Sequence, residues 1–451
     1  MVLTSSSSVQ RRFFRATRIG TTFARIYVGV KFNQLLDPRS PDIQAQERWS
    51  KFNRRSAQEI YAAAIELRGL ILKGCQFLGA RADALPPEYV QVLSSLQDRV
   101  PPHPLEEIQA QIELELRAPL RSVFSEFSES AMASASLAQV HEALLPNGQR
   151  VAVKVQYPEV ENLIHFDLAN LNTLFKAVGL LERDFDLAPL IAELGEHVPN
   201  ELDFVHEGIN AERVSDFFDH REDLYVPRIH WEMTTRRVLV SDFVSGIKIN
   251  DLVEIDRADF NREEIMTKLI EAYCEQVFVH GFFHADPHPG NLMVRAIPGT
   301  EKTLQIVFLD FGLAKELPHG FRKAILEFTG ALLGGNTDAM AGALLDLGFE
   351  TRGQSLDSLK KLAAAFHRIA SRLRYESHLA PDIIQEAGRE LPRLIREDPI
   401  IRIPSHLVLL GRVLALLSGL GRTLEVKVDM LQIILPYMAS KKPTTYSRSK
   451  K

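Results

Sequence analysis

Two short stretches of the sequence concentrate side chains that bind metal ions or move protons. The first is HADPHPGNLMV (284–294), and the second is VFLDFG (307–312), in which an apolar run leads into an aspartate. Together they contain Asp286, Asn291 and Asp310. Carboxylate and amide oxygens are ligands for Mg²⁺, and a positioned carboxylate can accept a proton. Whether these groups act together depends on the elements that carry them.

Length and composition indicate a globular protein with more than one packed unit. The chain has 451 residues, of which 45% are hydrophobic and 25% charged. This length suits two or three packed units, and the composition is that of a soluble protein with a real core. Two cysteines, Cys75 and Cys274, do not make a disulfide scaffold. A reducing compartment is therefore favoured.

Positive charge is concentrated at the two ends of the chain. Residues 1–36 carry six basic side chains and residues 441–451 carry five, with no acid in either segment. The remaining residues, 37–440, then have a net charge of −16. Such ends either contact an anionic membrane surface or are solvated tails. The Ser- and Arg-rich start also has the character of an organelle transit peptide.

We therefore expect a cytoplasmic protein that can lie peripherally on a membrane, with a mitochondrial or plastid location as the alternative. No transmembrane segment is predicted. The most apolar run is HLVLLGRVLALLSGLG (406–421), which Arg412 interrupts. It is shorter than the roughly 18 apolar residues that a spanning helix needs, and we interpret it as a buried helix.

The pattern of apolar residues predicts a helical start followed by a β-rich region. A helix is expected from Ser56 to Ala80, because Ser56 and Glu59 form a capping-box pattern. Two further helices are expected up to about residue 120. The segment from 134 to 156 then predicts a hairpin that turns at Asn147-Gly148. Beyond Gly246 the chain is mostly helical.

These elements predict an α+β fold with a small β-rich lobe and a larger helical lobe. The predicted parts are a basic segment, a helical extension, an N-lobe, a C-lobe and a basic tail, at residues 1–36, 37–125, 126–245, 246–440 and 441–451.

Several motifs occur in the order found in protein kinases. Lys154 lies in VAVK, on a strand after the hairpin, like the lysine strand of a kinase. HADPHPGN has the His-x-Asp pattern with an asparagine five residues after the aspartate, and LDFG follows. The loop before Lys154 differs, because ASASLAQVH (133–141) contains no glycine. A kinase carries a Gly-rich loop there to bring backbone N–H groups to phosphate.

The chain resembles the ABC1/AarF/UbiB family of atypical kinases, also called the coenzyme Q8 kinase-like or ADCK family. The resemblance rests on five stretches in family order, and it covers roughly residues 40 to 430. Besides VAVK, HADPHPGN and DFG, these are the Ala-rich loop ASASLAQVH and ELDFVHEGIN (201–210). KGCQ (73–76) matches the family's Lys-x-Gly-Gln motif, with Cys75 in place of glycine. Ser134 replaces the middle alanine of the Ala-rich loop.

The resemblance implies a role for each matching residue. Asp286 is the expected catalytic aspartate, and Asn291 and Asp310 are the expected magnesium ligands. Lys154 is expected to contact the phosphates of ATP or ADP and to pair with Glu201. Glu207, six residues further on and about 240° round a helix, is expected to face the metal or the N-terminal extension. The nucleotide-binding set is Ala133, Ser134, Ala135, Ser136, Leu137, Ala138, Gln139, Val140, Lys154 and Glu207.

Lys73 and Gln76 form the regulatory pair that the resemblance implies. On the predicted helix they lie about 60° apart and opposite the apolar stripe. Periodicity alone favours a solvated polar face for this pair. The resemblance instead implies an extension that covers the active site and turns both side chains toward it.

No Ala-Pro-Glu motif follows DFG within reach, so a peptide-docking segment is not expected. We therefore expect an ATP-dependent phosphotransferase or ATPase that uses Mg²⁺ and acts in lipid or ubiquinone-type metabolism, not on proteins. The expected partners are a nucleotide, an anionic membrane surface and a quinone- or lipid-like ligand, but no nucleic acid. The alternatives are a catalytically weak pseudokinase and a lipid-handling regulator of a membrane complex.

Overall fold

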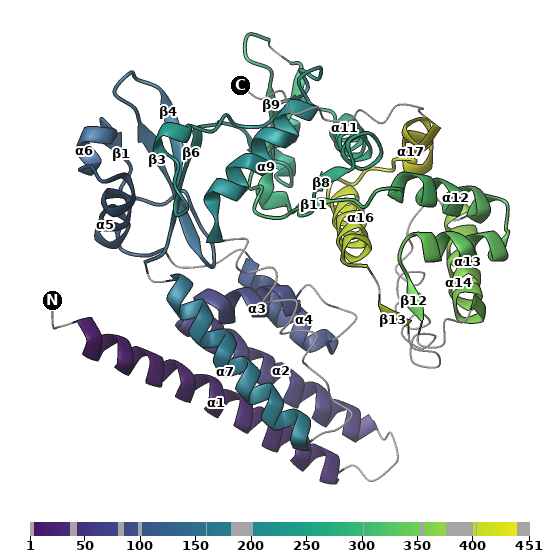
Figure 1. Cartoon of the computed structure of the whole chain (residues 1–451), viewed down its shortest axis with the longest axis horizontal. Coiled ribbons are helices and arrows are strands. Elements are labelled where there is room, and N and C mark those ends of the chain that lie inside the picture. The colour runs from purple at the N-terminus through teal and green to yellow at the C-terminus, as the bar shows by residue number, and fades with distance from the viewer. Residues whose placement is uncertain are drawn as a thin grey trace. The chain divides into compact units, whose positions relative to one another are not determined.

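The computed structural model describes residues 4–36, 43–79, 85–97, 102–158, 160–181, 202–300, 302–351, 356–375, 400–402 and 404–439. The chain divides into two compact units (Figure 1). The first holds Met1–His206 with Ile229–Phe243, and the second holds Glu207–Arg228 with Val244–Lys451. Both contain helices and strands, so the predicted α+β class is confirmed.

The first unit begins with helices that pack against one another. Figure 1 shows α1, α2 and α7 side by side, with α3 and α4 next to them. The helices of this unit are α1 (Thr4–Leu36), α2 (Ile43–Leu67), α3 (Gly69–Gly79), α4 (Pro87–Leu93), α5 (Leu105–Leu116), α6 (Leu120–Val123) and α7 (Val160–Leu181), with 3₁₀ turns at Ser94–Gln97 and Trp231–Met233.

A buried ion pair joins three of these helices. Arg15 of α1 donates from Nε to Oδ1 of Asp167 on α7 at 3.0 Å, and its Nη2 donates to Oδ2. Its Nη1 donates to the carbonyl of Leu67, the last residue of α2. The two charged side chains are 4% and 0% exposed. The predicted alternatives for this N-terminal helix were a transit peptide, a membrane-binding segment and a solvated tail. The helix contributes a buried side chain to this unit.

The predicted single helix from Ser56 to Ala80 is wrong in two respects. The helix begins at Ile43, so Ser56 lies inside α2 and is buried. It also breaks at Arg68 and Gly69, whose φ values of +54° and +57° are left-handed. Two left-handed residues end an α-helix. The angular positions calculated across this break therefore do not apply to α3.

A five-stranded antiparallel sheet forms the core of the first unit. Its path is β1-β3-β4-β6, and β2 also pairs with β3. Alternation puts the valines at 151, 153 and 155 on the buried face, which leaves Lys154 on the other face. The predicted hairpin is confirmed, with Gly148 at φ +85° in its turn. The strands are β1 (Glu126–Phe127), β2 (Ala133–Ser134), β3 (Ala138–Leu144), β4 (Arg150–Gln156) and β6 (Val238–Asp242).

The second unit is mostly helical around a small sheet of order β5-β10-β9-β7. Its helices are α9 (Phe204–Phe217, from Glu207 onward), α10 (Leu252–Arg257), α11 (Arg262–Cys274), α12 (Phe321–Leu333), α13 (Thr337–Asp346), α14 (Leu356–Tyr375), α16 (Ser405–Thr423) and α17 (Met430–Ala439). Its strands are β5 (Leu224–Tyr225), β7 (Ile247–Lys248), β8 (Phe282–His284), β9 (Leu292–Ala296), β10 (Leu304–Phe308), β11 (Ala314–Glu316), β12 (Glu350–Thr351) and β13 (Ile400–Arg402).

Polar caps fix the starts of several helices in this unit. The Asn261 side chain accepts from the backbone N–H groups of Glu263 and Glu264 at the start of α11. Asp251 and Asn336 cap α10 and α13 in the same way. Each cap satisfies an N–H group that the helix leaves unpaired. Most side chains of α11 from Ile265 to Cys274 are buried, so packing fixes the direction of this helix and of residues 275–280 after it.

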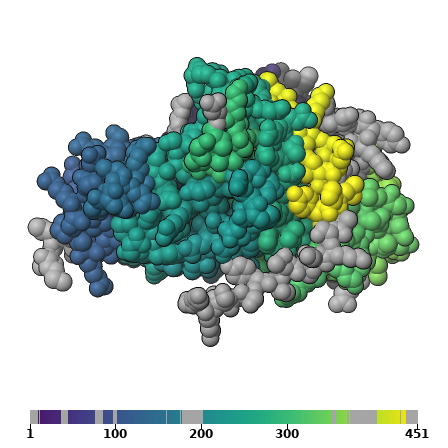
Figure 2. Space-filling view, turned by 90° about the horizontal axis from the view of Figure 1, so that it is seen from above, coloured from purple at the N-terminus to yellow at the C-terminus, as the bar shows by residue number. Residues whose placement is uncertain are grey.

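The apolar run that was predicted to form a buried helix lies in α16, and this helix is buried on one face only. Its buried side chains recur every three or four residues, at His406, Leu409, Val413, Leu417 and Leu420. Among the described helices, α16 is the one whose length and composition would allow it to cross a membrane, although core helices of soluble proteins can pass the same test. Figure 2 shows this yellow C-terminal segment against the teal and green body of the second unit, where α16 and α17 contact α11.

Candidate active site

The antiparallel pair β9–β10 brings Asn291 and Asp310 to the same end of the sheet. Phe308 pairs with Leu292 in this ladder, and the next N–H group, that of Leu309, donates to the carbonyl of Asn291 at 2.8 Å. Asn291 precedes β9 and Asp310 follows β10. All five residues of β10 are buried. The apolar run before Asp310 is thus a core strand that carries this aspartate to the sheet end.

The backbone of Asp310 is left-handed, with φ +54°. For a residue with a side chain, a sparsely populated backbone conformation costs on the order of 1–3 kcal/mol and persists where the surroundings impose it. Here the Asp310 carbonyl lies 2.6 Å from Nε2 of His284. Its Oδ1 accepts from the N–H group of Gly312 at 3.2 Å. These contacts hold the Asp-Phe-Gly segment in a defined conformation.

His284 supports the site as a neutral imidazole. It is fully buried, and this burial lowers its pKa. The Asp310 carbonyl can only accept a hydrogen bond, so Nε2 of His284 carries the proton. Its Nδ1 then accepts from the hydroxyl of Tyr273 at 3.0 Å. Burial, and next the charge of Asp286, raise the pKa of Tyr273, which keeps this hydroxyl protonated.

Asp286 follows β8 and lies next to a basic side chain that the sequence did not identify as part of the site. Arg412 of α16 donates from Nη2 to Oδ1 of Asp286 at 2.8 Å. The Asn291 amide nitrogen donates to the Asp286 carbonyl at 3.3 Å. The sequence offered one signal for a role of Arg412, namely that it is the one charged residue in an apolar run. Its partner, 126 residues away, could not be inferred from that signal.

Glu207 lies beside the Asp-Phe-Gly segment. It is only 4% exposed, on α9. A Cβ placed on Gly312 would meet Oδ1 of Asp310 at 3.3 Å and Oε2 of Glu207 at 3.7 Å. Asn210, one helical turn further along α9, donates to the carbonyl of Phe311 at 3.1 Å. The helix therefore brings a second carboxylate close to that of Asp310.

This donor set fits Mg²⁺. Asp310 and Glu207 supply carboxylate oxygens, and Asn291 uses its amide nitrogen on the protein, which leaves its oxygen as the donor for a metal. Within the described ranges, no three His, Cys, Asp or Glu side chains form a metal cluster. Mg²⁺ does not require one, because it retains waters and binds substrate phosphates through one or two carboxylates.

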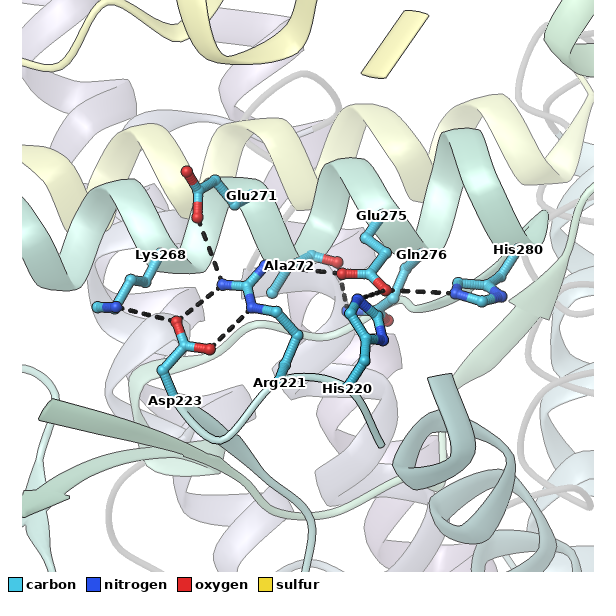
Figure 3. A network of polar contacts seen from close by, with 9 residues as sticks. All are labelled: His220, Arg221, Asp223, Lys268, Glu271, Ala272, Glu275, Gln276 and His280. Carbon is cyan, nitrogen blue, oxygen red and sulfur yellow. Dashed lines mark hydrogen bonds and ion pairs between the residues drawn. The ribbon is translucent and has the colours of Figure 1, made fainter. Parts of the chain in front are cut away.

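A charged network fixes α11, which precedes the segment that carries Asp286 (Figure 3). Arg221 contacts Asp223 at 2.8 Å, Glu271 at 3.3 Å and Glu275 at 3.6 Å. Lys268 donates to Asp223 at 2.9 Å. The bonds from Arg221, and next from Lys268, hold the pKa of Asp223 far below its usual value. The network thus joins the chain after α9 to α11.

At its end α11 changes to a π-helical turn, Glu275–His280. Oε1 of Glu275 lies 3.3 Å from Nε2 of His220 and 3.4 Å from Nε2 of His280 (Figure 3). The buried side chain of Gln276 donates to the carbonyl of Ala272 and accepts from the N–H group of His284 at 2.8 Å. π turns occur frequently at functional sites. This turn positions the strand that precedes Asp286.

The structure places Lys154 in the first unit, on β4. Its Nζ lies 5.1 Å from the centre of the Phe204 ring, a cation–π distance. Glu201, its predicted partner, lies outside the described residues. The pairing between these two residues stays a prediction.

The Ala-rich loop, residues 133–141, includes β2, the turn after it and the start of β3, and Tyr157 holds it in place. The Tyr157 hydroxyl donates to the carbonyl of Ala135 at 3.0 Å and accepts from Oγ of Ser134 at 2.8 Å. The His103 ring stacks on Tyr157 with 4.0 Å between ring centres. Ser134 thus makes a hydrogen bond that alanine could not make. Of the remaining predicted residues, Ser136, Leu137, Ala138 and Gln139 are buried, whereas Ala133 is exposed and Val140 half-buried.

Lys73 and Gln76 both belong to α3. Lys73 is half-buried, whereas the Gln76 side chain lies outside the described part of the chain. Cys75 packs in a core cluster with Ala64, Leu72, Leu93 and Leu96. Burial raises the pKa of its thiol to about 12. Cys75 therefore acts in packing.

Known proteins are similar to this chain over most of its length. The mouse AarF domain-containing protein kinase 1 is 38% identical over 71% of this chain and 61% of its own length. The chloroplastic ACTIVITY OF BC1 COMPLEX KINASE 7 of Arabidopsis thaliana is 31% identical over 87% of this chain and 55% of its own length. This chain thus spans less than two thirds of either relative.

The fold is similar to that of a solved structure, Rv3197 of Mycobacterium tuberculosis in complex with erythromycin. The TM-score is 0.59 at 22% identity, over 88% of this chain and 99% of that one. The family model for the ABC1 atypical kinase-like domain matches residues 95–344, which is more than half of the chain. The predicted kinase-like fold and family are therefore confirmed, and the chain belongs to the ABC1 atypical kinase-like family.

Proposed function

We propose that this protein binds Mg-ATP or Mg-ADP and transfers or hydrolyses the terminal phosphoryl group of ATP. The observation that carries this proposal is the meeting of Asp286, Asn291 and Asp310 in the second unit, on segments fixed by His284 and the β9–β10 ladder. Asp310, Asn291 and Glu207 would hold Mg²⁺, which neutralises charge on the phosphates when bound. Asp286 would orient the attacking hydroxyl or water.

We also propose nucleotide contacts for residues of the first unit. Lys154 would contact the phosphates, with Glu201 as its partner, and the loop from Ala133 to Val140 would cover them. This loop has no glycine, and Tyr157 fixes it from one side. That the extension, residues 37–125, covers the active site and turns Lys73 and Gln76 toward it stays a prediction from the family resemblance.

We propose a lipid- or quinone-like acceptor and not a protein. The Ala-Pro-Glu motif of a peptide-docking segment is absent from the sequence after DFG, and α12 begins at Phe321. The chloroplastic names of two plant relatives favour the organellar location over the cytoplasmic one. The basic ends support contact with an anionic membrane surface. The alternatives, a pseudokinase and a lipid-handling regulator, share the nucleotide site and differ in turnover.

The metal site can be tested with Asp310→Asn. We expect the change to remove most of the rise in Tm that Mg-ATP produces, because one of the two carboxylates near the metal is lost. Asp259→Asn is a matched control. Asp259 also has a left-handed backbone (φ +60°) in the second unit and pairs with Lys302 on the surface. An equal shift in wild type and Asp310→Asn would show that Asp310 does not bind the metal.

A further inference from the structure

Arg412 is placed on α16 where a charged residue is least expected. In residues 406–421 it is the one lysine, arginine, aspartate or glutamate. Its neighbours Leu409 and Val413 are buried, whereas the Arg412 side chain is 34% exposed. At 100° per residue it lies at the edge of the buried stripe. The helix therefore packs by its apolar face and presents one guanidinium at the boundary of that face.

The guanidinium binds the carboxylate that the proposed reaction uses. The distance from its Nη2 to Oδ1 of Asp286 is 2.8 Å, and the Asp286 side chain is 26% exposed. The other bonds of this segment, from Asn291 to the Asp286 carbonyl and from Ala285 to Leu313, hold the backbone only. Among the described residues, Arg412 alone forms a hydrogen bond or ion pair with the Asp286 carboxylate.

Stability alone is a weak reason for this contact. An exposed or half-exposed ion pair contributes about 0–1 kcal/mol to folding. An apolar side chain at position 412 would continue the composition of the helix at no desolvation cost. The geometry instead resembles that of a catalytic side chain and the second side chain that fixes its orientation toward the substrate.

We propose that Arg412 is a positioning residue for phosphoryl transfer. It holds the Asp286 carboxylate in the orientation that receives the acceptor hydroxyl or water, and it places a permanent positive charge beside the transferred phosphoryl group. Arginine suits this task because its planar guanidinium is always charged and carries several donors in a fixed geometry. This inference rests on the function proposed above.

The test compares Arg412→Ala, Arg412→Lys and wild type in the full-length chain, with ATP hydrolysis as the readout of turnover. Misplacing a catalytic group by about 1 Å can reduce the rate roughly a hundredfold. We expect Arg412→Ala to lower kcat by about ten- to a hundredfold and to leave the Tm shift with Mg-ATP unchanged. Arg412→Lys should recover part of kcat. Guanidinium ion at millimolar concentration should partly rescue Arg412→Ala, which a merely structural defect would not show.

Arg422→Ala is the matched control, because Arg422 is an exposed arginine on the same helix. We expect wild-type kcat for it. An unchanged kcat in Arg412→Ala overturns the proposal. An increased kcat overturns it too and would identify a latch. A loss of kcat together with an equal loss of the Mg-ATP shift, without guanidinium rescue, would assign Arg412 to folding or nucleotide binding.

A second measurement tests the proposal even if the protein shows no ATP hydrolysis. Hydrogen exchange of residues 284–291 should be faster in Arg412→Ala than in wild type and Arg422→Ala, because the carboxylate anchor of this segment is lost. Unchanged exchange would contradict the positioning role. The absence of a Tm shift with Mg-ATP in wild type would contradict the proposed function, and this outcome is distinguishable from a failure of the positioning role.

Discussion

Two arginine–aspartate pairs, one in each unit, use the same chemistry for different purposes. Arg15 and Asp167 are almost fully buried and share two hydrogen bonds, with a third from Arg15 to the Leu67 carbonyl. Arg412 and Asp286 are 34% and 26% exposed and share one hydrogen bond. Burial is what separates them. A buried charge must keep its partner, whereas a half-exposed carboxylate remains accessible to a substrate.

The largest expected effect on stability is that of Arg15→Ala. Removing one partner of a buried pair leaves an uncompensated charge, which typically costs about 3–5 kcal/mol. We expect a loss of this size in urea unfolding followed by circular dichroism. Arg18→Ala is the matched control on the same helix, since the Arg18–Glu66 pair is 29% and 44% exposed. Equal losses in the two variants would contradict the distinction by burial.

The pH dependence of Arg15→Ala sharpens the same distinction. Burial raises the pKa of Asp167, and the bonds from Arg15 lower it. Without Arg15, the folded-state pKa should rise further above the unfolded one. Such a group stabilises the fold at low pH, and this stability is lost as the pH rises through the folded-state pKa. The deficit relative to wild type should therefore shrink as the pH falls from neutral through the raised folded-state pKa of Asp167. A constant deficit would indicate that Asp167 keeps its charge by another contact.

The smallest expected effect on stability is that of Arg412→Ala, at about 0–1 kcal/mol. Salt should reduce it further, because partly exposed charges are screened. Urea unfolding at low and high ionic strength measures both. A loss as large as that of Arg15→Ala would show that this pair holds the fold together, and it would remove the basis for a positioning role.

The sequence predicted the short-range features of the molecule well. The hairpin at Asn147-Gly148 and the strands before Asn291 and Asp310 follow from local patterns. Motif spacing also identified residues that the fold brings together, because Asn291 and Asp310 lie at the ends of two paired strands. The roles of these residues stay predictions.

Long-range features could not be predicted from local patterns. Arg15 and Asp167 are 152 residues apart, and a basic residue in a basic segment gives no sign that it will be buried. The capping-box pattern at Ser56 also occurs inside a longer helix, where it has no effect on the start. Because the helix breaks at Arg68, the residues of α3 do not continue the angular positions of α2. The predicted placement of Lys73 and Gln76 opposite the apolar stripe therefore does not apply.

The π-helical turn Glu275–His280 has a consequence for how much length variation this part of the chain can tolerate. A π turn contains about one residue more than an α turn. It therefore acts as an insertion that is absorbed inside a helix. Removing one residue here would convert the turn to regular α-helical geometry and change the angular positions of the side chains within it. Gln276 could then no longer reach the N–H group of His284. Insertions and deletions between α11 and β8 should therefore be tolerated less well than substitutions.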